Sequence, residues 1–459
     1  MNNEMSHENV RSICEAFLDE MMELNDLPGL AVGVTWGNET FTGARGVRDV
    51  TTGDPLQATD VFHCASVSKL FTSSSVMKLV EAGALNLNDR LIDILPTLAK
   101  AGEVQTAKAG EVQIAKAGEV QIAKAGEVQS ASVGKGFADS GCGDPRWSDI
   151  RLWQMLSHTA GIGDTTDYHW EQALTGEDAL SDYVHSEEVT GRAMLCDPGK
   201  GEFHYSNDAY EMLGHIVAEK SAELAGEKLS YEGFVKRFLM EPAGMDDSTM
   251  LTFERIGVKA GEECPLITEA IRNRNAEADR NAEADSADSE WHPMALPHEK
   301  AEDRSIVPVT YYPYTRSHSP SSTLTSTVAD LLKWAQAHIK GFAAVEAADA
   351  AKATDAADVA GGVSGAPGAH GALLSFDSYQ HMHYEYATVP NNGEKMGLGW
   401  FMRRQKGYQL YGHEGTDDGF RASFWICPEL ELGIVVLSNL SGAPVKKLNK
   451  KLFDQLVCD

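Results

Sequence analysis

The chain has few positive charges for its size. Its 459 residues include 39 Lys and Arg against 68 Asp and Glu, so the formal net charge at pH 7 is −29. A surface this acidic repels phosphate backbones and anionic lipids, and we therefore expect neither nucleic acid nor a membrane as a partner. Hydrophobic residues make up 42% of the chain and aromatic residues 8%, which is enough apolar material for a folded core.

Paired cysteines and long apolar runs are also lacking. The seven cysteines are scattered and include no C-x-x-C pair, so neither a disulfide framework nor a zinc-finger site is expected. The N-terminal stretch has no basic segment followed by an apolar run, which a secretory signal would need. Apolar runs such as 433–437 are far too short to cross a bilayer. We therefore expect a soluble, cytoplasmic protein without a metal or other cofactor.

Apolar patterns at both ends of the chain predict an antiparallel sheet. Residues 30–43 contain two β-rich runs around a Gly-Asn pair, which is typical of a hairpin. Three short runs at 408–411, 421–426 and 431–437 predict an antiparallel meander, which we expect the hairpin to join. Helical periodicity occurs at 8–24, from Ser66 to about Ala82, and at 444–457.

Three segments of biased composition predict insertions in surface loops. Four copies of an octapeptide, AKAGEVQ followed by Thr, Ile or Ser, occupy 99–130, and a tandem RNAEAD repeat occupies 274–285. An Ala-, Asp- and Gly-rich stretch covers about 343–370. Lengthening a loop costs little conformational entropy, and these segments offer few residues to bury. We place the insertions at about 99–135, 270–295 and 343–370, with an arcade of short strands as the alternative for the octapeptides.

The main chemical signal is Ser66-x-x-Lys69. Residues three apart on a helix are separated by nearly one turn, so the Lys69 ammonium can lie beside the Ser66 hydroxyl. A serine at the start of a helix also lies near free backbone N–H groups. A lysine can activate a serine nucleophile when its environment lowers the lysine pKa. Because the motif is common by chance, it needs support from elsewhere in the chain.

Two further motifs supply this support. Tyr205-x-Asn207 follows a Pro-Gly turn, and His413-x-Gly415 stands at the end of a predicted strand. In this order the three motifs resemble the pattern of the serine β-lactamase and penicillin-binding-protein-like hydrolases. The match is most similar to the branch of class C β-lactamases, D-alanyl-D-alanine carboxypeptidases and related esterases. The resemblance extends over segments 155–162, 242–250 and 326–331.

The resemblance implies an α/β, β-lactamase/transpeptidase-like fold, in which helices flank an antiparallel sheet and a second lobe is mostly helical. It implies a single catalytic domain over residues 1–459. The sheet lobe is expected at about 1–65 and 390–459, and the helical lobe at about 66–335. The low-complexity insertions would be loops on this frame. The active site would lie in the cleft between the two lobes, with His413 on the edge strand.

The resemblance also implies roles for individual residues. Ser66 would attack a carbonyl carbon and form an acyl-enzyme. Tyr205, held beside Lys69, would be the base, which requires nearby positive charge to lower the phenol pKa. Asn207 would bind a substrate amide or orient Lys69. The backbone N–H groups of Ser66 and Thr416 would form the oxyanion hole.

His413, which we expect to bind substrate together with Gly415 and Thr416, bears on the substrate class. Many lactamases and carboxypeptidases have a lysine at this position, which is a fixed cation for a substrate carboxylate. A histidine is mostly neutral near pH 7, so carboxylate recognition is weakened and a small ester or amide is favoured as substrate. β-Lactam hydrolysis, D-alanyl-D-alanine carboxypeptidase activity and acyl transfer from the same acyl-enzyme are alternatives. A catalytically silent binding protein is a further one.

Other polar residues have ordinary structural explanations. His158 is expected to be structural, and Cys64 to be buried as a small hydrophobe. His381 and His383 would share one face of a strand, but no third ligand accompanies them at suitable spacing, so no metal site is expected there. Ser364 lacks both the preceding strand and the second glycine of a nucleophile elbow.

Overall fold

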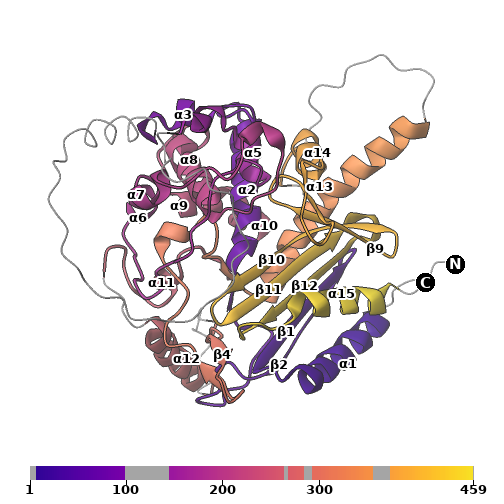
Figure 1. Cartoon of the computed structure of the whole chain (residues 1–459). Coiled ribbons are helices and arrows are strands. Elements are labelled where there is room, and N and C mark those ends of the chain that lie inside the picture. The colour runs from indigo at the N-terminus through magenta and orange to yellow at the C-terminus, as the bar shows by residue number, and fades with distance from the viewer. Residues whose placement is uncertain (1–6, 99–143, 263–266, 284–291, 355–372, 458–459) are drawn as a thin grey trace.

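The computed structural model describes residues 7–98, 144–262, 267–283, 292–354 and 373–457 (Figure 1). Within these residues, a large sheet carries long helices on its faces and adjoins a second group made mainly of helices. In this described part of the chain, no helix combines the length and the apolar character needed to cross a membrane. The architecture is the predicted α/β arrangement of an antiparallel sheet flanked by helices.

An eight-stranded antiparallel sheet is built from both ends of the chain, in the order β2-β1-β12-β11-β10-β9-β8-β7. The N-terminal hairpin joins the C-terminal meander through β1 and β12, where Val32 lies opposite Val436. This confirms the predicted sheet and the place of the hairpin in it. The strands are β1 (Gly29–Trp36), β2 (Glu39–Gly46), β7 (Ala387–Thr388), β8 (Lys395–Met396), β9 (Phe401–Gln405), β10 (Tyr408–Asp417), β11 (Phe420–Cys427) and β12 (Leu432–Ser438).

The central strands are buried on both faces. Along β1, Val32 packs in one apolar cluster with α1 (His7–Asn25) and α15 (Val445–Leu456), whereas its neighbour Ala31 belongs to the other cluster. The long helix α13 (Val328–Thr354) covers this second face. Successive strand residues point to opposite faces, so the unbroken apolar run of β1 contributes to two cores. α1 and α15, from opposite ends of the chain, lie side by side over the sheet (Figure 1).

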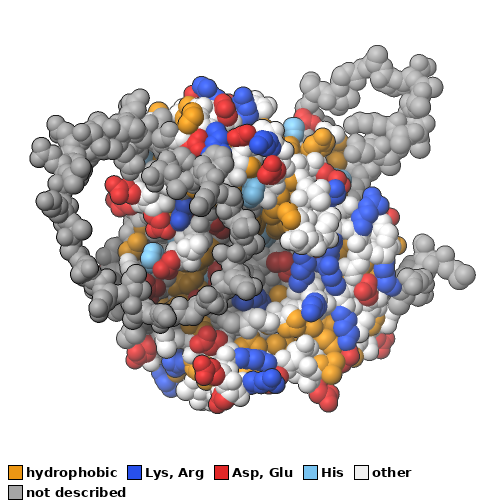
Figure 2. All heavy atoms as spheres, in the orientation of Figure 1, with side chains coloured by type: hydrophobic (Ala, Val, Ile, Leu, Met, Phe, Trp, Pro, Cys, Tyr) orange, Lys and Arg blue, Asp and Glu red, His pale blue; other side chains and the backbone are white. Residues whose placement is uncertain are grey.

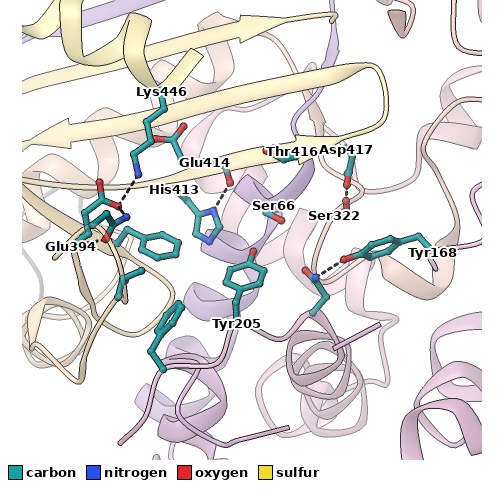
Figure 3. Close-up of a pocket in the computed structure, with 15 residues that line it drawn as sticks. Ser66, Tyr168, Tyr205, Ser322, Glu394, His413, Glu414, Thr416, Asp417 and Lys446 are labelled. Atoms are coloured by element: carbon teal, nitrogen blue, oxygen red, sulfur yellow. Dashed lines mark hydrogen bonds and ion pairs between the residues drawn. The ribbon is translucent and has the colours of Figure 1, made fainter. Parts of the chain in front are cut away.

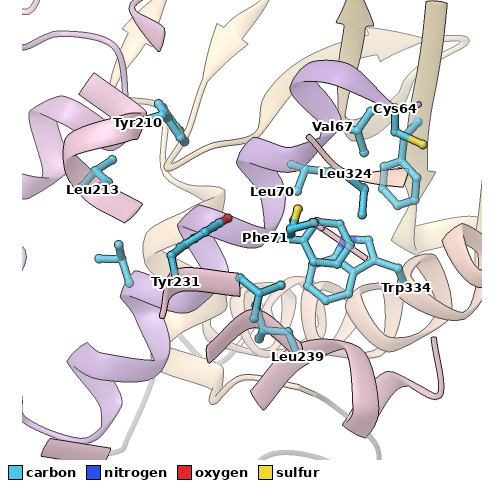
Figure 4. Close-up of a cluster of buried hydrophobic side chains, with 14 of the residues drawn as sticks. Cys64, Val67, Leu70, Phe71, Tyr210, Leu213, Tyr231, Leu239, Leu324 and Trp334 are labelled. Atoms are coloured by element: carbon cyan, nitrogen blue, oxygen red, sulfur yellow. The ribbon is translucent and has the colours of Figure 1, made fainter. Parts of the chain in front are cut away.

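The second group of helices surrounds α2 (Ser68–Glu81), which is buried along most of its length. Phe71 of α2 stacks on Trp334 of α13 with the ring centroids 4.0 Å apart, and Tyr231 lies in the same cluster (Figure 4). This packing fixes α2 and the turn that precedes it. The other α-helices of the group are α3 (Leu91–Ile94), α5 (Leu152–Leu156), α6 (Ala179–Val184), α7 (Glu187–Thr190), α8 (Asn207–Ala225), α9 (Tyr231–Val235), α10 (Glu241–Ala243) and α11 (Thr252–Arg255).

Short elements connect these parts. Two small antiparallel pairs are formed by β3 (Phe62–His63) with β6 (Thr325–Ser326), and by β4 (His298–Lys300) with β5 (Ile306–Pro308). The β3–β6 pair anchors the chain directly before the turn that carries Ser66. The remaining single turns are η1 (Ala65–Val67), η2 (Pro145–Asp149), η3 (Pro198–Lys200), η4 (Lys236–Met240), η5 (Arg316–His318) and η6 (Pro428–Leu430).

The prediction of a loop at the RNAEAD tandem is wrong, because α12 (Ile267–Glu283) contains most of it. Ile271, Asn275 and Ala278 are buried on one side of this helix. Asn275 Nδ2 donates to the Met294 carbonyl oxygen at 2.8 Å, and the Met294 N–H donates to Asn275 Oδ1 at 2.9 Å. The helix is therefore anchored by contacts with residues outside it, which its composition does not reveal.

The prediction for 343–370 is wrong in its first part, because α13 continues to Thr354. Alanine is the strongest helix former, so an Ala-rich stretch directly after a buried helix extends that helix. The rest of this segment and the octapeptides at 99–130 lie outside the described residues.

Candidate active site

Ser66 lies in η1, a single turn that leads directly into α2. Ala65 has a φ of 48°, a left-handed conformation that is strained for a residue with a Cβ. This turn places Ser66 at the N-terminal end of α2, where it is partly exposed while Ala65 and Val67 are buried. The α-helix itself begins at Ser68, two residues later than the sequence pattern predicts.

Lys69 is fully buried, and its Nζ contacts oxygen atoms from three other residues. The Nζ lies 3.0 Å from Ser66 Oγ, 2.5 Å from Asn207 Oδ1 and 3.0 Å from the carbonyl oxygen of Ser321. Burial lowers the pKa of Lys69 to about 8, although nearby carboxylates such as Glu211 act in the opposite direction. Lys69 can therefore exist as a neutral amine at mildly alkaline pH.

The surroundings of neutral Lys69 direct its lone pair toward Ser66. The oxygen of an amide can only accept hydrogen bonds, so the two N–H groups of the neutral amine donate to Asn207 and Ser321. The lone pair then faces Ser66 Oγ at 3.0 Å, within reach of the hydroxyl proton. Lys69 has the geometry of the group that accepts the proton of Ser66.

Asn207 is held in one orientation by Asp164. The Asp164 carboxylate accepts from the Asn207 backbone N–H at 2.6 Å and from Asn207 Nδ2 at 2.9 Å. Asn207 Nδ2 also donates to the Tyr168 hydroxyl oxygen at 2.5 Å. Because Nδ2 is bound on this side, Oδ1 is the atom that faces Lys69. Of the two roles predicted for Asn207, the structure places it in contact with Lys69.

Tyr205 lies in the loop before α8 and stacks on His158, with ring centroids 4.2 Å apart. Tyr205 and Ser66 border the same cavity, and Lys69 Nζ lies 5.0 Å from the centre of the Tyr205 ring. Burial raises the pKa of Tyr205 well above its usual range, and nearby carboxylates such as Asp164 add to this effect. The expectation that positive charge lowers this pKa is therefore wrong. Tyr205 is therefore a neutral phenol that keeps its proton.

Strand β10 brings His413, Gly415 and Thr416 against η1. A Cβ at Gly415 would lie 2.2 Å from the carbonyl oxygen of Cys64, so a residue other than glycine would push the strand away. Thr416 and Ser66 thus border the same cavity, as two N–H donors of an oxyanion hole must. His413 was expected on the edge strand, but β10 runs between β9 and β11. Its pairing with β9 ends at Gly412, so His413 and the residues after it pair with β11 beyond the end of β9.

His413 presents a hydrogen-bond acceptor to this cavity. Its Nδ1 lies 2.6 Å from the carbonyl oxygen of Glu414, which can only accept, so Nδ1 carries the proton. Burial lowers the pKa of His413 to about 3, and the ring is therefore neutral. Nε2 consequently carries a lone pair, and it is buried without a hydrogen-bond partner among the residues that the structure describes. Figure 3 shows the ring beside Tyr205 in the cavity wall.

The cavity has a volume of about 370 Å³ (Figure 3). Near Ser66, the Asp417 carboxylate accepts from His63 Nε2 at 2.7 Å and from the Ser322 hydroxyl. This end of the cavity is therefore bordered by a carboxylate and by neutral groups. The lining residues are Ser66, Tyr168, Phe203, Tyr205, Asn207, Ser322, Val389, Asn392, Glu394, Phe401, His413, Glu414, Thr416, Asp417 and Lys446.

An ion pair borders the opposite end of the cavity. Lys446 Nζ lies 2.8 Å from Glu394 Oε2, and Asn392 Nδ2 donates to the same oxygen at 3.0 Å. Phe203 and Phe401 supply apolar surface in the lining. Figure 2 shows Lys and Arg side chains gathered over α15 and β9, in spite of the acidic composition of the chain. The positive charge of Lys446 in the cavity lining is therefore neutralised by the carboxylate of Glu394.

The structure brings the predicted site residues together from distant parts of the chain, although their catalytic roles stay predictions. Sequence reasoning missed Asp164, Tyr168 and Asp417. Asp417 directly follows Thr416, so its place in the strand could have indicated it. Asp164 has no such signal, because it lies 43 residues from its partner Asn207. The residues that meet at the site are Ser66, Lys69, Tyr205, Asn207, His413, Gly415 and Thr416.

His158, Cys64, His381 and His383 lie outside the cavity lining, and Ser364 falls outside the described residues. His158 Nδ1 accepts from the Ser206 backbone N–H at 3.1 Å, so His158 supports the Tyr205 loop. Cys64 is buried, as expected. His381 and His383 end the helix α14 (Phe376–His383) and do not lie on a strand, so they do not share a face.

The fold and the arrangement of Ser66, Lys69, Tyr205 and His413 define the β-lactamase/transpeptidase-like class of proteins. The chain belongs to the Beta-lactamase family, whose model matches residues 14–457. This confirms the family that the three sequence motifs indicate. The match includes all the predicted site residues.

Comparison with individual proteins agrees with this assignment. The chain is 26% identical to penicillin-binding protein 4 of Amycolatopsis lactamdurans over 239 residues, which cover 52% of this chain and 49% of the relative. The chain thus matches about half the length of that relative. Among solved structures, it is similar to the octameric penicillin-binding protein homologue from Pyrococcus abyssi, with a TM-score of 0.64, 19% identity and coverage of 98% and 77%. It is also similar to a D-stereospecific amidohydrolase from Streptomyces sp., with a TM-score of 0.59, 15% identity and coverage of 97% and 98%.

Proposed function

We propose that the chain is a serine hydrolase that forms an acyl-enzyme on Ser66 and acts on small esters or amides. The observation that carries this proposal is the contact between the buried Lys69 Nζ and Ser66 Oγ at 3.0 Å. A lysine that is buried and held by two acceptor oxygens has its lone pair free for the serine proton. An arrangement of this kind argues against a catalytically silent binding protein.

The first half of the reaction is acylation. Ser66 Oγ attacks the substrate carbonyl carbon while its proton passes to neutral Lys69. The carbonyl oxygen becomes negative and accepts hydrogen bonds from the N–H groups of Ser66 and Thr416. When the tetrahedral intermediate collapses, the bond to the alcohol or amine breaks. Tyr205 gives its proton to this leaving group and receives one from Lys69, so charge and protons balance.

The second half of the reaction is hydrolysis of the acyl-enzyme. Water attacks the acyl carbon, and its proton is taken by Lys69 either directly or through Tyr205. The bond to Ser66 Oγ then breaks, and Ser66 recovers its proton. An alcohol or amine that enters in place of water would give acyl transfer with the same groups.

The charges around the cavity support an ester or amide without a carboxylate close to the scissile bond. His413 is neutral and offers only an acceptor, and Asp417 adds a negative charge beside Ser66. The cation in the lining, Lys446, is paired with Glu394. A penicillin or a peptide C-terminus would therefore find no free positive charge near Ser66 among the described lining residues. The similarity to a D-stereospecific amidohydrolase supports including amides in the substrate class.

The substrate proposal predicts that a cation at position 413 changes selectivity. We compare an uncharged activated ester, an amino-acid amide and benzylpenicillin as substrates of the wild type and His413→Lys. The wild type should have the highest kcat/KM with the ester or the amide. A new charge-assisted hydrogen bond should raise the ratio of penicillin to ester kcat/KM about tenfold in His413→Lys. A wild type that prefers penicillin would contradict the substrate class but not the acyl-enzyme on Ser66.

A further inference from the structure

A second cluster of chemically reactive side chains lies in the segment that leads to Tyr205. Cys196, Glu202 and His204 each contribute one donor atom, and the three atoms all lie within 4.8 Å of one another. Glu202 and His204 border a neighbouring cavity of about 590 Å³, and Phe203 borders both this cavity and the one beside Ser66. The cluster is therefore separate from the groups that act on the substrate.

The distances in the cluster suit ligands that share a metal ion. Glu202 Oε2 lies 3.6 Å from His204 Nε2, which is too long for a hydrogen bond. Two ligands at about 2.1 Å from one tetrahedral ion are about 3.4 Å apart, so this pair needs little movement to bind the same ion. The Cys196 thiol must move toward the other two donor atoms by about 1 Å at most to bind the same ion.

The donor atoms are also available for a ligand. His204 Nε2 is shielded from solvent and makes no hydrogen bond with the described residues. Its backbone is fixed, because the His204 N–H donates to the carbonyl oxygen of His158 at 2.8 Å. The nearby cations Arg146 and Lys200 both form ion pairs with Asp197. Arg146 Nη1 lies 3.7 Å from Asp197 Oδ1, and Lys200 Nζ lies 3.3 Å from Asp197 Oδ2.

We propose that Cys196, Glu202 and His204 bind a zinc ion, with water as the fourth ligand. Thiolate, imidazole and carboxylate together form a donor set that zinc prefers, and binding displaces the thiol proton into solvent. The five residues between Cys196 and Glu202 do not match a zinc-finger spacing, which is why the sequence predicts no metal. Through its bonds to Cys196, Glu202 and His204, the ion would link residue 196 to the segment that carries Tyr205. It would stabilise this segment without contacting the substrate.

Cobalt(II) provides a direct test, because a cobalt–thiolate bond absorbs in the near ultraviolet. The full-length protein is treated with a chelator and titrated with cobalt(II), and zinc(II) is then added. We expect one cobalt per chain, a thiolate charge-transfer band, and loss of this band when zinc displaces the cobalt. The band should be absent in Cys196→Ser. In His204→Gln and Glu202→Gln, binding should be at least tenfold weaker.

Two controls keep the test decisive. His381→Gln changes an exposed histidine on α14 and should bind cobalt like the wild type. Circular dichroism shows whether each variant is folded, and zinc should raise the Tm of the wild type but not of folded Cys196→Ser. A wild type without a charge-transfer band, or a band that persists unchanged in folded Cys196→Ser, would overturn the proposal. The proposed hydrolase activity is not affected by either result.

Discussion

At the scale of single residues, the proposed reaction depends on the proton of Lys69. Burial favours the neutral amine, while the carboxylates of Glu211, Asp164 and Asp417 favour the ammonium ion. The result is a lysine whose pKa of about 8 lies close to physiological pH. A group with such a pKa can accept a proton in one step and return it in the next.

The first prediction concerns pH. If neutral Lys69 is the base, kcat/KM for an uncharged ester should rise with pH and level off above a pKa of about 8. Lys69→Arg, which stays protonated at every accessible pH, should lower kcat/KM at least a thousandfold. Lys200→Arg on the exposed turn η3 is the control and should retain wild-type activity. A wild-type profile that is flat between pH 6 and about 10 would contradict the role of Lys69.

The second prediction concerns Asp164 as a positioning residue. Asp164→Asn removes a negative charge near Lys69, so the pKa of Lys69 should fall and the rising limb of kcat/KM should move to lower pH. The amide of Asn207 also loses its fixed orientation, and kcat should fall by about ten- to a hundredfold. The exposed Asp167→Asn should change neither quantity. An unaltered pH profile with reduced kcat would show that Asp164 has only a structural role.

The residues of the site could be predicted from the sequence where they form compact motifs. Ser66-x-x-Lys69 and Tyr205-x-Asn207 bring together groups that are close along the chain. Asp164 could not be found in this way, because its contact with Asn207 depends on how two distant loops meet. The direction of the Tyr205 pKa shift could not be predicted from the sequence either, since it depends on how the folded chain buries the side chain.

At the scale of elements, the oxyanion hole depends on how closely β10 approaches η1. The strand passes the carbonyl oxygen of Cys64 at Gly415, where a side chain would collide. The positions of the polar groups in the site thus depend on how closely the two backbones pack. Small displacements of β10 should therefore affect catalysis more than stability.

The third prediction tests this contact with Gly415→Ala. The added methyl group would lie 2.2 Å from the Cys64 carbonyl oxygen, so β10 must move away from Ser66. A displacement of about 1 Å should lower kcat/KM by about a hundredfold. Gly176→Ala, where the added group meets no atom within 4 Å, is the matched control. Equal activities of the two variants would contradict the role given to Gly415.

Strands and helices with a regular apolar pattern were predictable, and irregular ones were not. The hairpin, the meander and α15 follow their periodicity. α12 was missed, because its repeat is highly polar and its stability comes from Asn275 and Ile271 packing against other segments. Tertiary contacts of this kind override local propensity. The position of β10 inside the sheet depends on β9, β8 and β7, and two of these strands are only two residues long.

At the scale of the whole molecule, the first and last helices close one face of the sheet. Phe17 of α1 and Leu452 of α15 are buried in the same apolar cluster with β1 and β12. The elements that carry Ser66 and His413 are packed on the other side of this sheet or within it. The terminal helices therefore stabilise the fold from the face of the sheet that lies away from the proposed catalytic residues.

The fourth prediction follows from this separation. Leu452→Ala should lower the free energy of unfolding by about 2–5 kcal/mol, because it leaves a cavity in a fully buried cluster. Urea unfolding measures this loss. At low temperature the folded variant should keep wild-type kcat/KM. Leu24→Ala, at a side chain that is 66% exposed on α1, should change stability by less than about 0.5 kcal/mol.

The central claim is that Ser66 forms an acyl-enzyme, and intact-mass spectrometry tests it most directly. The wild type and Ser66→Ala are each incubated with an activated ester, an amino-acid amide, a penicillin and a fluorophosphonate. We predict that the fluorophosphonate labels the wild type once per chain, that the ester gives a transient acyl adduct, and that Ser66→Ala gains no mass. An equal adduct on Ser66→Ala, or no adduct on the folded wild type with any of these reagents, would contradict the account.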